Sequence, residues 1–249
     1  MSTADLLIVG VAVILGALVK SVTGMGLPLI ALPIISLFVS PETGIAVLAI
    51  PAIVQNVGIV ATNWHARSQT RGLLSFCLAG GVGVVLGTLS LGAVPEQVTL
   101  IALNATIISW LYQRLRNPDH RVSHDKERTY SPIAGLIAGV FQGGSGVSGP
   151  VVAAWHQALR LPRDAFVFSI ATAFGLIGIA QTITLAARGH LEGRLLVSLL
   201  ISVIVLSSVP FGPPLRRRLS GAAFDRAVLV LVIASCISLT VDIIVSFVR

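Results

Sequence analysis

Long apolar runs, separated by short polar segments, dominate the hydrophobic pattern of this chain. Runs without Asp, Glu, Lys or Arg cover residues 44–62, 72–92, 97–113, 131–159, 165–187 and 195–215. A helix needs about 20 apolar residues to cross the hydrocarbon core of a bilayer, and most of these runs are long enough. The pattern therefore predicts an all-α, polytopic bundle of membrane helices.

Composition excludes a soluble domain. Hydrophobic residues make up 55% and charged residues 11% of the 249 positions. Soluble proteins carry about 25% charged residues, so a chain this poor in charge could not cover a folded surface with polar groups. The net charge of +7 resides in short loops, which is typical of membrane topology rather than of nucleic-acid binding.

Two polar stretches that interrupt apolar sequence indicate an internal duplication. They are "KSVTGMGLP" at residues 20–28 and "FQGGSGVSGP" at residues 141–150, and Gly24 aligns with Gly146 at an offset of 122 residues. At nearly the same offset, "SPET" at 40–43 falls on "LPRD" at 161–164, and "RGLL" at 71–74 falls on "GRLL" at 193–196. We therefore predict one membrane domain, 1–249, made of a first repeat (1–113), a cytoplasmic linker (114–130) and a second repeat (131–249).

The apolar flanks of each polar stretch are shorter than a full span. They cover residues 6–19 and 27–38 in the first repeat, and 131–141 and 147–158 in the second. Each repeat is therefore expected to open with a hairpin of short helices that dips into the membrane, followed by three crossings, giving about eight to ten helical segments in all. Two full crossings in place of each hairpin remain an alternative with the same parity. Non-helical backbone at membrane depth survives only beside protein or a wet cavity, so the breaks must line something polar.

Basic residues predict the orientation. The loops at 67–71, 114–128, 160–163 and 216–226 fall on one side and hold 13 of the 17 Lys and Arg residues. That side should be cytoplasmic, with both termini opposite. Three crossings per repeat is an odd number, so the repeats are expected to be inverted relative to each other. The "RRR" at 216–218 is interpreted as a topology signal and nothing more specific.

The breaks have the chemistry of an anion site. A helix that begins after each break would present unpaired N–H groups and a positive dipole end at membrane depth, which bind anions well. Inverted repeats with interrupted helices are typical of secondary transporters. The candidate substrate-binding residues are the break residues and the polar side chains within apolar runs: Lys20, Ser21, Thr23, Gly24, Gly26, Gln55, Asn56, Gln142, Gly143, Gly144, Ser145, Gly146, Ser148 and Gln181.

Lys20 indicates the sign of the ligand. A cation at the bilayer centre costs about 2.5–3.5 kcal/mol, and the nearest acidic residues in sequence, Asp5 and Glu42, are expected near the far surface. A bound anion would therefore be the partner of the ammonium. The alternatives are a Lys20 side chain that reaches an interface, and Gln55, Asn56 and Gln181 side chains that hydrogen-bond between helices.

Structural roles, rather than substrate binding, are expected for several other polar or small residues. Close helix packing is expected for Gly80, Gly81, Gly83 and Gly87, and it is an alternative for the break glycines. His156 is expected to be packed, and Asp242 to be solvated near the outer end of the last span.

Enzymatic roles find no support in the sequence. There are no paired acids at membrane depth, no "HExxH" metal motif and no "GxxxxGK" phosphate loop, and the two cysteines are isolated. We expect no catalytic activity, no metal, no cofactor and no nucleic-acid partner. The expected partners are the bilayer and a small anion, and association with further copies of the chain stays open. A non-transporting scaffold would leave the polar breaks unexplained, whereas a passive anion channel would not.

The break motifs carry a family resemblance. "TGMGLPLIALP" at residues 23–33 and "GVFQGGSGVSGP" at residues 139–150, within duplicated apolar halves, resemble the sulfite exporter TauE/SafE family of membrane transporters. The resemblance implies movement of sulfite, sulfonates or carboxylated organic anions across the cytoplasmic membrane of a prokaryote. The expected mechanism is alternating access around a midplane site between the breaks. A passive channel and a carboxylate transporter of the same family are the alternatives.

Overall fold

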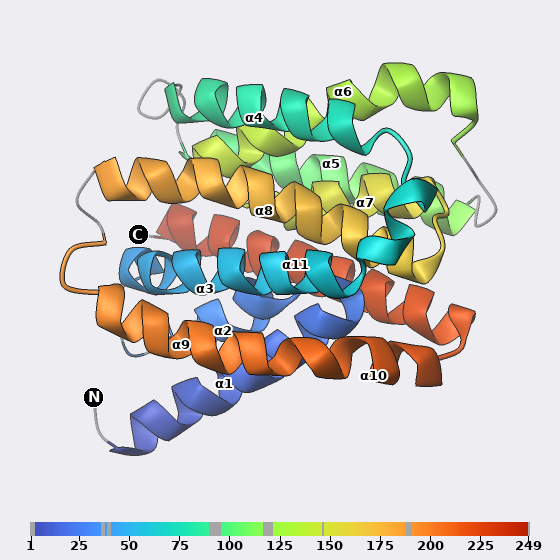
Figure 1. Ribbon diagram of the computed structural model, residues 1–249. Helices are drawn as coiled ribbons and strands as arrows, with labels where there is room; N and C mark the ends of the chain where they lie inside the picture. Colours follow the sequence, from blue (N-terminus) through green and yellow to red (C-terminus); the bar gives the residue numbers. More distant parts are fainter. Residues whose placement is uncertain are drawn as a thin grey trace. The chain divides into compact units, whose positions relative to one another are not determined.

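The computed structural model describes residues 3–35, 38, 41–89, 96–116, 122–145, 147–187 and 191–248. Every regular element among these residues is a helix (Figure 1). The elements are α1 (Thr3–Thr23), α2 (Leu27–Ile35), α3 (Pro41–Thr62), η1 (Trp64–Gln69), α4 (Leu73–Leu89), α5 (Glu96–Arg116), α6 (His124–Ser145), α7 (Gly149–Ala158), α8 (Arg163–Ala187), α9 (Leu195–Ser208), η2 (Val209–Phe211), α10 (Gly212–Arg218) and α11 (Gly221–Val248). The predicted all-α fold is confirmed.

Several of these helices have the length and composition of membrane spans. Three described segments are long and apolar enough to cross a bilayer: Arg163–Ile183, Leu195–Arg218 and Gly221–Val241. Shorter apolar helices cover Leu7–Thr23, Ala46–Thr62, Leu73–Leu89 and Ile101–Tyr112. Large apolar side chains such as Leu74 and Leu196 are 73% and 71% exposed, as contact with lipid requires. The chain is a multi-pass membrane protein.

Long and short helices follow the same order in the two parts of the chain. A long helix, a short helix and three long segments occur as α1–α5, and again as α6–α11 when α9, η2 and α10 are counted as one segment. This order fits the predicted duplication, which itself stays a prediction. The first helix of each pair is longer than the apolar run that predicted it, because the polar residues beside the run are helical too.

The chain forms two compact units, and each draws on both predicted repeats. The first unit comprises Met1–Ser68 and Arg163–Asp225. In it, α3 packs against α8 and α9, while α1 and α2 form a hairpin. Its apolar core lies between α1, α2, α3 and α9, and is formed by Val13, Ala17, Leu27, Ala31, Ile35, Leu48 and Val205.

Helix α3 contains a proline whose cost is offset by a neighbouring helix. Pro51 has no N–H to donate to the carbonyl of Val47, one helical turn earlier. The hydroxyl of the buried Ser198, on α9, donates to that carbonyl at 3.0 Å. The proline-induced gap in α3 thus becomes a polar contact between α3 and α9.

The second unit comprises Gln69–Pro162 and Arg226–Arg249. Its tightest contact joins α4 and α6, where small residues let two backbones approach closely. A Cβ added at Gly139 would collide with the carbonyl of Gly80, and one at Gly83 with the carbonyl of Leu136. The predicted packing role is confirmed for Gly83 and Gly87 and wrong for Gly81, around which a Cβ would find open space.

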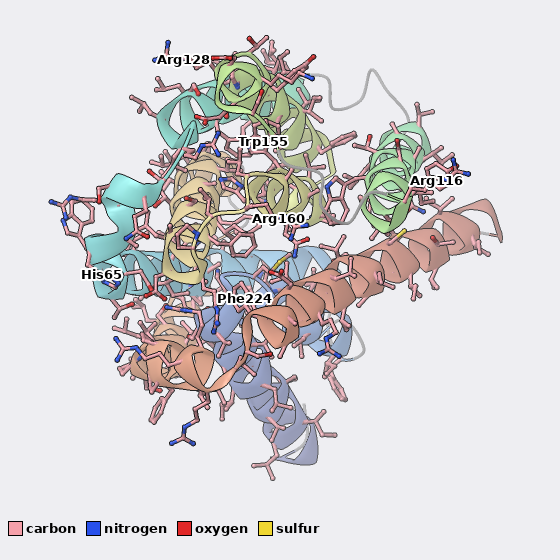
Figure 2. All side chains as sticks on the ribbon, turned by 90° about the vertical axis from the view of Figure 1, so that its right-hand side faces the viewer. His65, Arg116, Arg128, Trp155, Arg160 and Phe224 are labelled. Atoms are coloured by element: carbon pink, nitrogen blue, oxygen red, sulfur yellow. The ribbon has the colours of Figure 1, made fainter. Side chains whose placement is uncertain are left out.

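Several basic residues that were assigned to loops or helix ends are exposed in this unit, whereas Arg160 is half-buried. Figure 2 shows Arg116 and Arg128 pointing away from the helices that carry them, and both are exposed. Arg71 is an exception, because its Nε donates to Glu127 Oε2 at 2.8 Å in a largely buried ion pair. This pair connects the segment before α4 to the first turns of α6.

Candidate functional site

The first break is narrower than the polar stretch that predicted it. Helix α1 continues to Thr23 and α2 begins at Leu27, so only three residues lie between them. Gly24 and Gly26 have φ angles of +86° and +127°, which glycine adopts without the strain of a side chain. The hydroxyl of Thr23 lies 2.7 Å from the carbonyl oxygen of Met25 and 2.9 Å from that of Val19, so it closes the turn.

Lys20 is buried in the last turn of α1. The residue is 3% exposed, and its Nζ donates to the carbonyl of Ala52 in α3 at 3.3 Å. Among the residues that the structure describes, no Asp or Glu forms an ion pair with it. The side chains of Asp5 and Glu42 lie outside the described part. An ammonium group in this setting is one that a bound anion would stabilise.

A network of hydrogen bonds links Ser21, the residue after Lys20, to Gln55 and Ser208. Gln55 Nε2 donates to the carbonyl of Ala17 at 2.7 Å and lies 3.2 Å from the hydroxyls of Ser21 and Ser208. Those two hydroxyls are 2.9 Å apart. Because Ser208 donates to the carbonyl of Val205 at 2.6 Å, its oxygen accepts from the other two groups. The network joins α1, α3 and α9 beside the break.

Two amide oxygens in the same unit are buried without a partner in the described structure. They are Gln55 Oε1 and Asn56 Oδ1, on residues that are 0% and 2% exposed. Asn56 faces α8, because a Cβ added at Gly175 of that helix would lie 3.6 Å from the Cβ of Asn56. Gln181 lies further along α8 and is half-buried.

The second break lies between α6 and α7 in the second unit. Ser148 is buried and donates to Gln142 Oε1 at 2.6 Å. Its hydroxyl oxygen accepts no capping bond from the N–H groups that open α7. Gly143 and Gly144 lie in the last turns of α6, which pack against α4. A Cβ added at Gly143 would collide with the carbonyl of Val84, and a Cβ added at Gly87 would approach the nitrogen of Gly144. Gly146 and the side chain of Ser145 lie outside the described residues.

The structure thus brings part of the predicted set together. Lys20, Ser21 and Gln55 share one buried cluster, directly before the turn that contains Thr23, Gly24 and Gly26. Gln142 and Ser148 pair at the second break. A ligand site shared by the two breaks stays a prediction.

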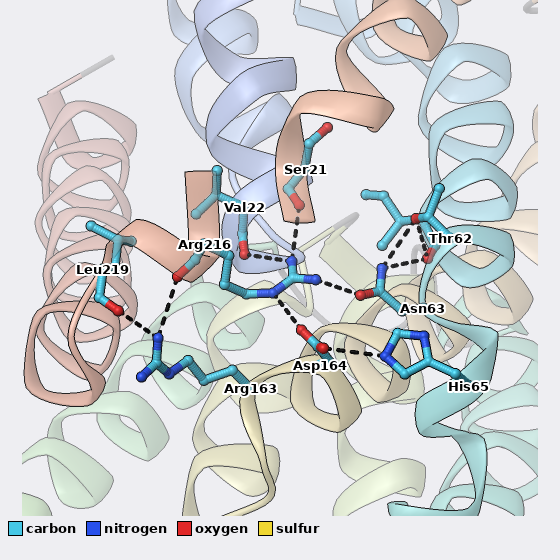
Figure 3. Close-up of polar contacts among 10 residues, drawn as sticks. Ser21, Val22, Thr62, Asn63, His65, Arg163, Asp164, Arg216 and Leu219 are labelled. Carbon is cyan, nitrogen blue, oxygen red and sulfur yellow. Dashed lines mark hydrogen bonds and ion pairs between the residues drawn. The ribbon is translucent and has the colours of Figure 1, made fainter. Parts of the chain in front are cut away.

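Sequence analysis missed the residue that holds this end of α1. Arg216 is 1% exposed, and the structure surrounds it with acceptors (Figure 3). Its Nε donates to Asp164 Oδ1 at 2.8 Å, its Nη1 to the carbonyls of Ser21 (3.3 Å) and Val22 (3.1 Å), and its Nη2 to Asn63 Oδ1. The interpretation of "RRR" as a topology signal only is therefore wrong for Arg216, whereas Arg217 and Arg218 are exposed. The available signal was the four-residue spacing of Ser208, Gly212 and Arg216, which places them on one helix face.

His156 and Asp242 were given structural interpretations. His156 is 0% exposed, its Nδ1 lies 2.8 Å from the carbonyl of Val152, and its ring packs edge-on against Phe76 at 4.9 Å. The prediction of a packed histidine is confirmed. The side chain of Asp242 lies outside the described part.

Comparison with known proteins decides the family. The family model described as "Sulfite exporter TauE/SafE" matches residues 8–239. The chain belongs to this family. Membership in TauE/SafE implies membrane transport of sulfur-containing anions, in agreement with the apolar helices. Neither the curated proteins nor the solved structures gave a match.

Metal binding finds no support in the described residues of this TauE/SafE member. They contain no group of three or more His, Cys, Asp or Glu side chains that could hold an ion. Asp164 and Arg216 of the first unit instead form a hydrogen-bonded ion pair beside the end of α1.

Proposed function

We propose that this TauE/SafE member is a secondary transporter of sulfite, sulfonates or related small anions in a prokaryotic cytoplasmic membrane. The main support for this proposal is Lys20, a buried lysine whose Nζ donates to a single backbone carbonyl within the described structure. A substrate anion would bind this ammonium, with the hydroxyl and amide groups of Ser21 and Gln55 close by.

Helix dipoles alone leave the Lys20 charge uncompensated. The C-terminal end of a helix carries roughly half a negative charge, and the end of α1 shares it between Lys20 and Arg216. Arg216 has Asp164 as a counter-ion, but Lys20 has no described carboxylate. A small anion would supply the missing charge at little cost in reorganisation, because the cluster is already formed.

The breaks support alternating access around this site. Each break interrupts a helix pair within an apolar segment, and transporters with inverted repeats bind their substrates at such interruptions near the midplane. At the second break, Ser148 leaves the α7 N-terminus without a side-chain cap, so its N–H groups stay available to an anion. A conformational change that opens the site first to one side of the membrane and then to the other would complete the transport cycle.

Anion-induced thermal stabilisation of the purified protein tests the binding site. Wild type, Lys20→Gln and Lys126→Gln would be melted with sulfite, thiosulfate, sulfate, small sulfonates and small carboxylates. Lys126 is the matched control, since it is the chain's other lysine and is exposed. A ligand at about 100 times its dissociation constant adds about 2.7 kcal/mol to the folded state. We expect stabilisation by sulfur oxyanions or sulfonates in wild type and Lys126→Gln, and its loss in Lys20→Gln.

Other outcomes redirect the proposal in specific ways. Stabilisation by carboxylates alone would identify a carboxylate transporter. Equal stabilisation of Lys20→Gln would remove Lys20 from the site, and no response to any anion would contradict anion transport. In proteoliposomes, efflux of a labelled anion that accelerates when unlabelled anion is added outside distinguishes a carrier from a passive channel, which shows no such exchange.

A further inference from the structure

Three residues on one helix face contact a single residue of α1. Ser208, Gly212 and Arg216 follow one another at intervals of four along α9, η2 and α10, which run on as one nearly continuous rod (Figure 1). The hydroxyl of Ser208 is 2.9 Å from that of Ser21, and Arg216 Nη1 is 3.3 Å from its carbonyl oxygen. Between them, Gly212 packs so closely that an added Cβ would collide with the same carbonyl. This stripe therefore fixes both the side chain and the backbone of Ser21.

Arg216 satisfies the open end of α1. The last carbonyls of a helix have no intrahelical donor, and a buried carbonyl without a donor is costly. At the end of α1 the carbonyls of Ser21 and Val22 both accept from Arg216 Nη1. A cation is also favoured at this negative helix end. The guanidinium thus allows α1 to stop inside the protein, directly before the glycine turn.

The guanidinium is itself held from two further segments. Asp164, at the start of α8, accepts from Arg216 Nε, and Asn63, after α3, accepts from Nη2 (Figure 3). Asp164 Oδ2 lies 3.2 Å from His65 Nε2. Arg163 Nη1 donates to the carbonyl of Leu219 at 2.5 Å, which fixes the end of α10. The end of α1 is thereby tied to α3, α8 and α10.

Arg216 and Lys20 differ in how their donors are used. Four acceptors surround the Arg216 guanidinium, so this group is engaged by the protein rather than open to a ligand. The Lys20 ammonium has three N–H donors and one acceptor within the described structure. Lys20 directly precedes Ser21, and both belong to the same helical turn.

We infer that Arg216 is a positioning residue, which places the Lys20 ammonium for the anion by holding the last turn of α1. The inference rests on the proposed function for the role of Lys20, but the hold on α1 is independent of it. Substituting Arg216 frees the carbonyls of Ser21 and Val22, so the turn frays and the ammonium loses its fixed position.

Two measurements on the full-length protein test this inference. The first is hydrogen–deuterium exchange of the segment 17–26, in wild type, Arg216→Gln, Gly212→Ala and the exposed neighbour Arg217→Gln. The second is uptake of radiolabelled sulfite by proteoliposomes. We expect faster exchange of this segment in Arg216→Gln and Gly212→Ala, with a KM for sulfite about tenfold higher and a kcat within about twofold of wild type. Arg217→Gln should match wild type in both measurements.

The KM–kcat split separates positioning from general destabilisation. A variant that only folds poorly would lower the number of active transporters, and hence the apparent kcat, at an unchanged KM. Gly212→Ala provides a second variant that keeps every charge, should Arg216→Gln fail to fold. Unchanged hydrogen–deuterium exchange of segment 17–26 in the folded variants would overturn the inference, whatever the kinetics of sulfite uptake. So would faster exchange at an unchanged KM. If wild type carries no sulfite, sulfite is excluded as a substrate, and the exchange measurement still decides whether Arg216 holds the helix end.

Discussion

Among single residues, Ser198 has a role that depends on a proline in another helix. Its hydroxyl donates to the Val47 carbonyl that Pro51 leaves without an intrahelical donor. Ser198→Ala should leave that carbonyl unsatisfied and destabilise the protein by about 1 kcal/mol, within the range found for hydrogen bonds between membrane helices. Thermal unfolding in detergent measures the change.

Ser207→Ala is the control for that substitution. Ser207 is exposed and donates only to the carbonyl of Ile204 within its own helix, at 2.7 Å. Its loss should change the melting temperature little. Equal melting temperatures for the two variants would mean that the contact between Ser198 and Val47 contributes nothing measurable.

Single residues also differ in how far sequence could identify them. Lys20 and Gln55 stand out because each is polar within an apolar run, and both prove buried. Arg216 differs from its two arginine neighbours only in its four-residue spacing from Ser208 and Gly212, and its inward direction depends on the rotation of α10. Ser208 is equally hidden, because a serine in an apolar helix commonly bonds its own backbone, as Ser208 also does with Val205.

At the scale of helix contacts, two glycines of α4 allow a matched comparison of stability, because only one of them lies against α6. A Cβ at Gly83 would collide with the Leu136 carbonyl of α6, whereas one at Gly81 would meet nothing within 4 Å. Gly83→Ala should therefore overpack the contact and cost about 1–3 kcal/mol. Gly81→Ala should be neutral or stabilise by up to about 1 kcal/mol, because alanine is the better helix former.

Thermal unfolding of the two alanine variants in the same detergent compares them directly. A Gly83→Ala protein as stable as Gly81→Ala would show that α4 and α6 can separate without loss, which the close backbone contact argues against. A large loss in both would point to a need for glycine flexibility in α4 itself.

Helices were predictable as segments, but their ends and contacts were not. Apolar runs located the spans because lipid demands them. The apolar pattern did not show that Lys20 and Ser21 belong to α1, because polar side chains can also lie in a helix when they find hydrogen-bond partners. It also could not tell that Gly143, beside the second break, packs against Val84, because one glycine serves a turn or a helix contact equally well.

For the whole molecule, the two compact units divide the chain differently from the predicted repeats. Each unit combines helices from both repeats, as α3 with α8 and α9 in the first unit shows. Sequence could not reveal this exchange, because apolar helix faces carry little information about their partners. Each unit contains one of the two breaks.

Sidedness is the prediction that tests the topology of the whole chain. With Cys77 and Cys236 replaced by alanine, single cysteines at Lys126 and Glu192 would be labelled in intact cells with a membrane-impermeant maleimide. Both positions are exposed in the structure, so failure to react reports on the membrane rather than on burial. We expect Glu192→Cys to react in intact cells, and Lys126→Cys to react only after permeabilisation, because the basic segment around Lys126 should be cytoplasmic.

The same pair of positions tests the number of crossings between them. In the predicted topology, the α6–α7 hairpin returns the chain to its starting side whether it dips into the membrane or crosses twice, and α8 then crosses once. The total is odd in both cases, so Lys126 and Glu192 must lie on opposite sides. Labelling of both from outside would contradict this parity and with it the inversion of the two repeats. Labelling of Lys126→Cys alone would keep the inversion and reverse the orientation, placing the basic loops outside.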